Sequence, residues 1–280
     1  LKIEQEIGRG GFGIVKRGSY KNSGVAVKYF NGTLTEDLVK QIFDEIQIMA
    51  NLRHSNIVQI YGYCPDIHNP AIVMEFMANG SLYDALYGRK EKLPFPKRLL
   101  IAHDIASGLS RLHADNILHR DIKSQNILLD ENNKAKLTDF GLAKVKSESR
   151  SKMSTKSSSV GTYPWMAPEL SKLKNKPATE CDVYSFGIVL WELASQSQPP
   201  FKEYWDRAEL IPRSLLDKDL DPEPLPKDCD KAFGQLVNDC RNLEPKDRPT
   251  MDKVVQRLTA LKESLLKPQL VEQTINYQMY

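Results

Sequence analysis

Two short stretches decide the fold: residues 119–126 read H-R-D-I-K-S-Q-N, and residues 137–141 read L-T-D-F-G. Each lies next to a short apolar segment, which is the pattern of loops at strand ends. Asp121, Asn126 and Asp139 would supply oxygen ligands of the kind that Mg²⁺ prefers. One of the two carboxylates would remain available as a base for proton transfer. Taken separately, each stretch could equally be an ordinary turn rich in Asp and Asn.

A glycine-rich stretch, G-R-G-G-F-G-I-V, occupies residues 8–15 between two predicted strands. Gly8, Gly10 and Gly13 would let a backbone loop come close to phosphate groups, because any Cβ would block the approach. A tight glycine-rich hairpin explains the stretch about as well. A dinucleotide-binding fingerprint is disfavoured, because it needs a helix directly after the glycines and here a strand follows.

A strand lysine and a helix glutamate form a predicted pair. Lys28 lies in V-A-V-K-Y-F (25–30), and on its own it could be an ordinary surface lysine. Glu45 falls within the apolar face of a predicted helix over 35–50, where an unpaired carboxylate would be costly to bury. Lys28 is its natural partner, and the pair could present the ammonium group to a phosphate.

The remaining pattern divides the chain into a β-rich first part and a helical second part, joined near residues 75–80. Besides the helix at 35–50, the first part has predicted strands at 3–7, 14–20, 25–30, 57–63 and 71–76. The second part has predicted helices at 81–87, 96–113, 180–194, 231–241 and 250–266. Two stretches are expected to be loops: serine-rich 146–161 and proline-rich 196–228.

The composition excludes several classes of protein. The 280 residues are 41% hydrophobic, which excludes a disordered tail or a collagen-like fibre. A net charge of +3 argues against a protein built mainly to bind nucleic acid or anionic membrane. No apolar run is long enough to span a bilayer, and the N-terminus does not resemble a signal peptide. Because the chain begins at Leu1, we expect a domain cut from a longer protein.

The four cysteines are widely spaced and form no C-x-x-C motif. In a chain of this size without a secretory signal, they indicate reduced thiols and not a disulfide framework or a zinc site. We therefore expect a cytoplasmic protein. The cysteines are Cys64, Cys181, Cys229 and Cys240.

Over residues 1–266 the chain resembles a eukaryotic-type protein kinase catalytic domain. The glycine-rich loop, V-A-V-K, H-R-D-x-K-x-x-N, D-F-G and A-P-E (167–169) occur in the order typical of that family. Lys123, together with G-T-Y-P-W-M-A-P-E and C-D-V-Y-S-F-G-I-V-L-W-E-L, is similar to the tyrosine-kinase-like serine/threonine group. That group includes mixed-lineage, receptor-interacting and interleukin-receptor-associated kinases.

The resemblance implies an α+β, bilobal fold: a small antiparallel β-sheet N-lobe with one main helix, and a larger, mainly helical C-lobe. The implied boundaries are a kinase domain at 1–268, with N-lobe 1–76, hinge 75–79 and C-lobe 80–268, and a C-terminal tail at 269–280. ATP would bind between the lobes, with Met74 at the back of its pocket. The residues implied to contact ATP are Ile7, Gly8, Gly10, Gly11, Gly13, Val15, Ala26, Lys28, Glu75, Met77 and Leu128.

Four residues are implied to be catalytic: Asp121, Lys123, Lys28 and Glu45. Asp121 would accept the proton of the substrate hydroxyl, and Lys123 would steady the γ-phosphate. Asn126 and Asp139 would hold Mg²⁺.

The resemblance also implies structural contacts. Asp182 would brace the backbone of the catalytic loop, and Glu169 would pair with Arg248. An apolar column linking the lobes would consist of His119, Phe140, Met49 and Ile60.

The serine-rich segment is a predicted switch. Ser158 occupies the usual primary phosphorylation position of the family, with Ser157 and Ser159 beside it. A phosphate there could bind Arg120, since phosphorylation adds charge that arginine pairs with. We expect autophosphorylation to activate the domain, with self-association possible for transfer between copies.

The expected partners are protein substrates with Ser or Thr acceptors, without nucleic acid and without a membrane segment in this chain. Three other functions remain open: a nucleotide-binding pseudokinase scaffold, a small-molecule phosphotransferase of related fold, and a tyrosine-directed or dual-specificity kinase. Lys28, Asp121 and Asp139 argue against the scaffold, since each is present. The A-P-E segment argues against a small-molecule kinase, and Lys123 with Thr162 favours Ser/Thr acceptors.

Overall fold

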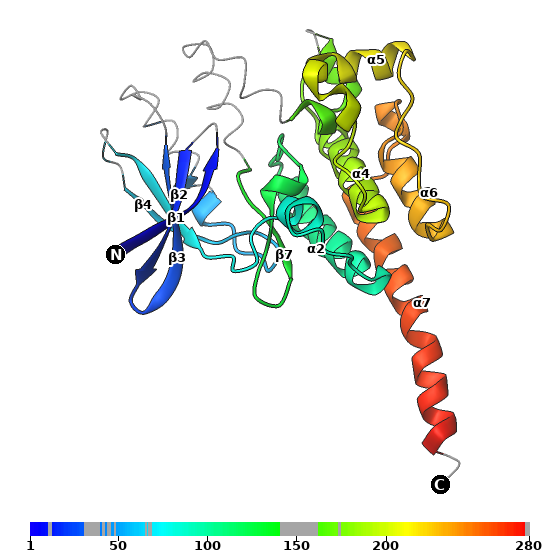
Figure 1. The fold of residues 1–280 in the computed structure, drawn as a ribbon, viewed down its shortest axis with the longest axis horizontal. Coiled ribbons are helices and arrows are strands. Elements are labelled where there is room, and N and C mark those ends of the chain that lie inside the picture. The colour runs from blue at the N-terminus through cyan, green and yellow to red at the C-terminus, as the bar shows by residue number, and fades with distance from the viewer. Residues whose placement is uncertain are drawn as a thin grey trace.

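The computed structural model describes residues 1–10, 13–30, 40, 43, 46–47, 49–64, 66, 69–140, 162–172 and 175–277, with side chains up to residue 265. A five-stranded antiparallel sheet comes first in the chain, and the second part is mainly helical (Figure 1). The predicted α+β fold with a β-sheet N-lobe and a helical C-lobe is confirmed.

The N-lobe sheet has the strand order β1-β2-β3-β5-β4. Its strands are β1 (Lys2–Gly10), β2 (Gly13–Tyr20), β3 (Ser23–Phe30), β4 (Ile60–Cys64) and β5 (Ala71–Glu75). Because side chains alternate along a strand, Val25 and Val27 of β3 pack with Ala71 in a small cluster on one face. Ala26 belongs to the main core on the other face, and Lys28 shares that face.

The helix predicted over 35–50 is described only in part. Within this range, residues 40, 43, 46, 47, 49 and 50 are helical. Phe43, Ile46 and Met49 are buried, in agreement with the predicted apolar face. Glu45 and its predicted pairing with Lys28 lie outside the described residues.

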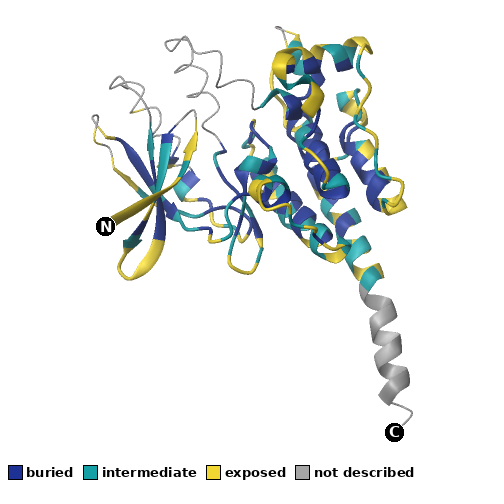
Figure 2. Ribbon diagram, viewed as in Figure 1, coloured by how far each residue is buried: buried dark blue, intermediate teal, exposed yellow. Residues whose placement is uncertain are grey.

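The longer helices of the C-lobe are α2 (Phe95–Ala114), α4 (Thr179–Ser195), α6 (Lys231–Cys240) and α7 (Met251–Tyr277). Helix α4 is buried along most of its length, as the dark blue ribbon in Figure 2 shows. Its sequence is apolar around nearly the whole circumference, which is typical of a helix at the centre of a domain.

The described part of the C-lobe also contains several short elements. They are η1 (Asp84–Gly88), η2 (Ser124–Asn126), η4 (Tyr163–Trp165), η5 (Pro168–Ser171), η6 (Lys202–Leu210), α5 (Ile211–Asp217) and η7 (Pro245–Asp247). Strands β6 (Ile127–Leu129) and β7 (Ala135–Leu137) form an antiparallel hairpin. The H-R-D stretch enters β6 and the D-F-G stretch leaves β7, so both motifs lie at strand ends, as predicted.

Two predictions on secondary structure were wrong. Residues 196–228 were expected to be a loop because of their prolines, but they contain η6 and α5. Pro212 lies in the first turn of α5, where a missing N–H costs no helical hydrogen bond. Helix α7 also continues beyond residue 266, where a helix end was predicted.

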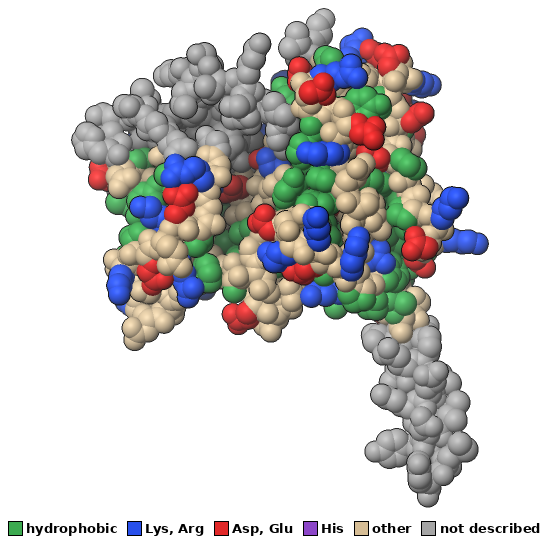
Figure 3. All heavy atoms as spheres, in the orientation of Figure 1, with side chains coloured by type: hydrophobic (Ala, Val, Ile, Leu, Met, Phe, Trp, Pro, Cys, Tyr) green, Lys and Arg blue, Asp and Glu red, His purple; other side chains and the backbone are tan. Residues whose placement is uncertain are grey.

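Two further features concern the distribution of surface charge and the apolar character of the helices. Basic and acidic side chains are interspersed over the face that Figure 3 shows. Within the described part of the chain, no helix combines the length and the apolar character needed to cross a membrane.

Candidate active site

Lys28 and Asp139 form an ion pair between the lobes. The Lys28 ammonium lies 2.6 Å from Oδ1 and 2.5 Å from Oδ2 of Asp139, although 111 residues separate them in the chain. Lys28 is 6% exposed, so the pair is largely shielded from water. Asp139 has a φ of 62°, a left-handed conformation that Asp tolerates better than most residues. The strand lysine and the D-F-G aspartate are therefore brought together.

The Asp121 carboxylate lies within a network of hydrogen bonds. Oδ2 accepts a bond of 3.0 Å from the Asn126 side-chain amide, which also donates to the Asp121 backbone carbonyl at 2.7 Å. Oδ1 lies 3.2 Å from both the Lys123 ammonium and the Thr162 hydroxyl. Lys123 also donates to the Thr162 hydroxyl at 2.9 Å. A carboxylate, an ammonium and a short hydroxyl side chain thus converge on one point.

A buried aspartate of α4 supports the catalytic loop (residues 119–126). Asp182 accepts backbone N–H bonds of 2.8 Å from His119 and from Arg120, and the His113 ring lies 3.0 Å away. These bonds hold Arg120 at a φ of 65°, a left-handed conformation that is unfavourable for a long side chain. The predicted bracing role of Asp182 agrees with these contacts.

The apolar residues predicted to contact adenine come from both lobes. Ala26 and Met74 are Cα partners across β3 and β5, and both belong to the main core together with Met77. Val15 and Leu128 pack against that core and are partly buried. Ile7 is 43% exposed, which is the exposure expected of a residue at the rim of a site.

The Glu75 side chain has partners that sequence reasoning missed. Its carboxylate pairs with the Lys136 ammonium of β7 and accepts a 3.2 Å bond from the Gln59 backbone N–H. The charge pair joins the end of β5 to the C-lobe hairpin. No sequence motif marks Lys136, so only the fold shows this contact.

The glycines of the first hairpin have different surroundings. A Cβ at Gly13 would overlap the Tyr29 carbonyl oxygen of β3, so Gly13 is required for strand packing. Among the described residues, a Cβ at Gly10 would meet nothing within 4 Å, and one at Gly8 would only touch Val15. The next glycine, Gly11, lies outside the described residues.

The residues predicted to bind Mg²⁺ have the right chemistry for that ion. Because the Asn126 amide nitrogen donates to Asp121, its oxygen Oδ1 is the atom left for a cation. Asp139 supplies a carboxylate. Magnesium usually takes one or two protein carboxylates and completes its shell with water and phosphate oxygens. Among the described residues, no group of three or more His, Cys, Asp or Glu is placed to hold a metal ion on its own.

A second ion pair lies behind the A-P-E segment. Arg248 donates to both carboxylate oxygens of Glu169, at 2.7 and 2.9 Å, and to the Glu180 backbone carbonyl at 2.9 Å. Burial alone would raise the pKa of Glu169, but the hydrogen bonds and charge of Arg248 lower it below its ordinary value. The predicted Glu169–Arg248 pair is present.

Two other predictions have a mixed outcome. The His119 and Phe140 rings lie 6.1 Å apart, and Phe140 packs in the core that also contains Met49 and touches Ile60. The ring distance agrees with the His119–Phe140 part of the predicted apolar column, and Met49 and Ile60 lie in or against the same core. Ser157, Ser158 and Ser159 lie outside the described residues, and Arg120, their predicted partner, is exposed.

Sequence reasoning also missed Glu192, a completely buried carboxylate of α4. It accepts hydrogen bonds from Ser124 and Trp165, which lie in the catalytic loop and in η4. A signal was available: Glu192 is an acidic residue within the apolar run F-G-I-V-L-W-E-L, the same kind of argument that singled out Glu45.

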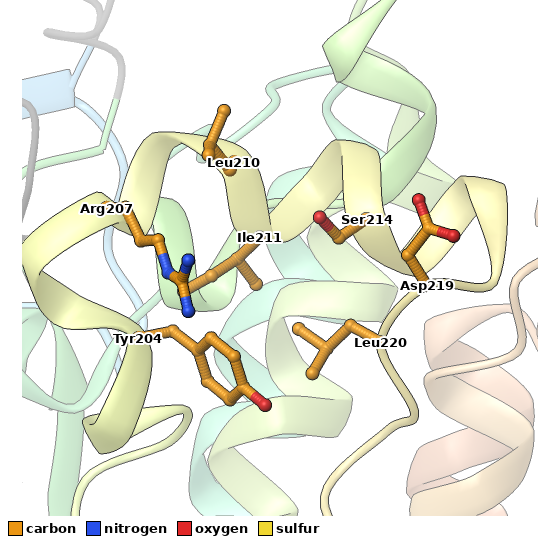
Figure 4. Close-up of a pocket in the computed structure, with 7 residues that line it drawn as sticks. All are labelled: Tyr204, Arg207, Leu210, Ile211, Ser214, Asp219 and Leu220. Atoms are coloured by element: carbon orange, nitrogen blue, oxygen red, sulfur yellow. The ribbon is translucent and has the colours of Figure 1, made fainter.

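One cavity of the C-lobe lies away from all these residues. It has a volume of about 190 Å³ between η6, α5 and the residues that follow α5. Figure 4 shows its lining side chains: Tyr204, Arg207, Leu210, Ile211, Ser214, Asp219 and Leu220. The Arg207 guanidinium lies 5.7 Å from the Tyr204 ring centroid. None of the residues predicted to bind ATP lines this cavity.

Comparison with known proteins places this geometry in a family. The family model described as protein tyrosine and serine/threonine kinase matches residues 1–258. The chain is 34% identical to serine/threonine-protein kinase STY17 of Arabidopsis thaliana over 93% of its own length and 44% of that relative. It is 36% identical to serine/threonine-protein kinase CTR1 of Arabidopsis thaliana over 96% of its length and 32% of that relative.

A third relative comes from another organism. The probable serine/threonine-protein kinase drkB of Dictyostelium discoideum is 37% identical, over 93% of this chain and 37% of the relative. The chain thus spans less than half the length of these relatives. The fold, the arrangement of the five motifs and the family match agree, and the chain belongs to the protein tyrosine and serine/threonine kinase family.

Proposed function

We propose that this domain transfers the γ-phosphoryl group of ATP to Ser and Thr hydroxyls of proteins. The observation that carries the proposal is the network around Asp121, in which Lys123 and Thr162 meet one oxygen of its carboxylate. An acceptor hydroxyl placed at this point would have a base, a cation and a positioning hydroxyl within hydrogen-bond range.

The nucleotide would bind between β1, β2 and the β6–β7 hairpin. Ile7, Val15 and Ala26 would cover the adenine ring, with Leu128 on its other side. Backbone groups of Glu75 and Met77 would bond its edge, and Gly8, Gly10, Gly11 and Gly13 would border its phosphates. Lys28 would orient the α- and β-phosphates, since an ammonium on a buried strand is a fixed positive charge. Glu45 would hold Lys28 once Asp139 turns to the metal.

Mg²⁺, held by Asn126 and Asp139, would neutralise charge on the phosphate oxygens. The chain itself contributes the acceptor side of the reaction. Asp121 would take the hydroxyl proton on Oδ1, while the Asn126 amide keeps Oδ2 in place. Lys123 would balance negative charge near the transferred group. Most of the rate enhancement would come from positioning and electrostatic stabilisation.

The Lys123–Thr162 hydrogen bond supports a preference for Ser and Thr acceptors. This bond is 2.9 Å long, and the resemblance to the kinase family implies that such a Lys–Thr pair shapes a pocket for short hydroxyl side chains. The named relatives are serine/threonine kinases, which favours the same acceptors.

Regulation through Ser157, Ser158 and Ser159 belongs to this proposal as well. Exposed Arg120 lies next to Asp121 in the chain and could bind a phosphate brought to it by the serine-rich segment. Transfer between two copies would require self-association. A cytoplasmic location fits the four free thiols of the described structure.

The test compares acceptor peptides that differ only in one residue, Ser, Thr or Tyr, in the presence of MgATP. We expect phosphate on the Ser and Thr peptides, and none with the Asp121→Asn variant. Transfer to Tyr alone would overturn the acceptor assignment. A nucleotide-binding pseudokinase would instead give binding of MgATP with no transfer to any of the three.

A further inference from the structure

Glu192 lies in the last part of α4 and has no exposed surface. Its neighbours along the helix are apolar, and a buried carboxylate is costly unless hydrogen bonds compensate. A buried carboxylate can position other residues through its hydrogen bonds, or it can have no such role. The hydrogen-bond partners of Glu192 show which of these applies.

The two oxygens of Glu192 bind two different segments. Oε1 accepts a 2.6 Å bond from the Ser124 hydroxyl, and Oε2 accepts a 2.8 Å bond from the Trp165 indole N–H. Ser124 and Trp165 are themselves fully buried. Burial raises the pKa of the Tyr87 hydroxyl, and the nearby Glu192 carboxylate raises it further, but this hydroxyl makes no hydrogen bond of good geometry to any described residue.

Each of these segments carries a residue of the Asp121 network. Ser124 follows Lys123 directly, and Trp165 donates its backbone N–H to the Thr162 carbonyl at 3.1 Å. Lys123 and Thr162 in turn bond each other. These contacts form a closed ring: Glu192 binds Ser124, Ser124 adjoins Lys123, Lys123 bonds Thr162, Thr162 bonds Trp165, and Trp165 bonds Glu192.

We propose that Glu192 is a positioning residue for phosphoryl transfer, which holds the catalytic loop and the 162–165 segment in the register that places Lys123 and Thr162 against Asp121. This inference rests on the proposed function for its kinetic consequences, but its structural consequence is independent of activity. Glu192 touches neither the acceptor nor the nucleotide in this arrangement, so it acts through Ser124 and Trp165.

Two substitutions of similar volume separate geometry from charge. In Glu192→Gln, the amide oxygen can accept from Trp165, which is only a donor, and the amide nitrogen can donate to the Ser124 hydroxyl, which can also accept. In Glu192→Leu, both partners lose their bond and remain buried. Glu180→Gln is the matched control, because Glu180 lies on the same helix with its side chain away from this ring.

The experiment measures steady-state kinetics and hydrogen–deuterium exchange on the same preparations. We expect Glu192→Leu to lower kcat/KM for the acceptor peptide by about tenfold or more, with KM for ATP changed by less than about threefold. Glu192→Gln should retain most of the activity, and Glu180→Gln all of it. Exchange in Glu192→Leu should rise in peptides covering 119–126 and 162–165, while the middle of α4 stays protected.

The possible outcomes separate a failure of the positioning role of Glu192 from a failure of the proposed kinase activity. If the unmodified protein transfers no phosphate, the proposed function fails, and the exchange result alone decides the inference. If hydrogen–deuterium exchange in Glu192→Leu is unchanged in both segments, the positioning role of Glu192 is overturned. An equal loss of affinity for ATP and for the acceptor peptide overturns it as well. Should Glu192→Leu not fold, Ser124→Ala and Trp165→Phe each remove one bond of the ring, and both should show the same selective loss in acceptor kcat/KM.

Discussion

At the scale of single residues, the chemistry of this chain depends on how a few side chains share hydrogen bonds. Asp121 uses both carboxylate oxygens, one toward Asn126 and one toward Lys123 and Thr162. Asp139 bonds Lys28 here, and its proposed metal role would require it to exchange that partner. The positions of the two aspartates therefore depend on their hydrogen-bond and ion-pair partners.

The Thr162 hydroxyl joins Lys123 to Asp121, and its removal should affect transfer selectively. Thr162→Val keeps the shape of the side chain but loses the bridge, whereas Thr162→Ser keeps the bridge. We expect Thr162→Val to lower kcat for Ser and Thr peptides by about 10- to 100-fold, with little change in the dissociation constant of MgATP measured by titration calorimetry. Equal activity of Thr162→Val and Thr162→Ser would contradict the role assigned to the hydroxyl.

Glu192 should give the protein a pH-dependent stability. Burial raises its pKa to about 7, although hydrogen bonds from Ser124 and Trp165 oppose the shift. Between the unfolded pKa and about 7 the folded state binds a proton that the unfolded state has lost, so this group's contribution to the free energy of unfolding falls as pH rises through that window. The contribution is fully present below the unfolded pKa, and it stops changing above about 7.

The variant Glu192→Gln has no proton to lose, so this part of the pH dependence should disappear. Relative to the unmodified protein, we expect it to gain stability between pH 5 and pH 8 by up to about 3 kcal/mol. Urea unfolding at the two pH values measures the difference. If the difference in unfolding free energy between the two proteins is the same at pH 5 and pH 8, Glu192 does not titrate in this range.

At the scale of elements, much of the fold could be predicted from local patterns. Strand β3 was predictable because it is rich in β-branched and aromatic residues, and α4 because its apolar run is long. The prolines of 196–228 misled the prediction, since a proline in the first turn of a helix is compatible with that helix. Long-range pairs such as Glu75–Lys136 follow from the fold alone and leave no signal along the chain.

For some residues around the catalytic motifs, the family resemblance also supplied the partners. Asp182 and the Glu169–Arg248 pair are examples. Glu192 was missed because no motif names it, although its place in an apolar run was visible. Local sequence thus locates charged residues inside apolar faces, but it cannot say which segments they bind.

The first hairpin offers a test of how two glycines differ. A Cβ at Gly13 would overlap the Tyr29 carbonyl, whereas a Cβ at Gly10 would meet no described atom within 4 Å. We expect Gly13→Ala to lower the free energy of unfolding by about 1–3 kcal/mol, because β2 must move away from β3. Gly10→Ala should leave stability nearly unchanged. Thermal unfolding of the two variants decides the matter, and equal melting temperatures would show that the β2–β3 packing is not as described.

At the scale of the whole molecule, one continuous core joins the lobes. Ala26, Met74 and Met77 at the N-lobe side belong to the same cluster as the buried residues of α2 and α4. Asp182 and Glu192, both on α4, reach the catalytic loop, and Glu192 also reaches η4. The central helix therefore connects the core of the domain to the catalytic loop and to η4.

The central claim, that Asp121 makes this domain an active kinase, is tested most directly by intact-mass spectrometry after incubation with MgATP. We expect the unmodified protein to gain phosphate, with peptide analysis locating it among Ser157–Ser159, and Asp121→Asn to gain none while still binding MgATP. Equal incorporation by both proteins would contradict the role of Asp121. No incorporation by either, with thermal stabilisation by MgATP in both, would contradict the claim of catalysis itself.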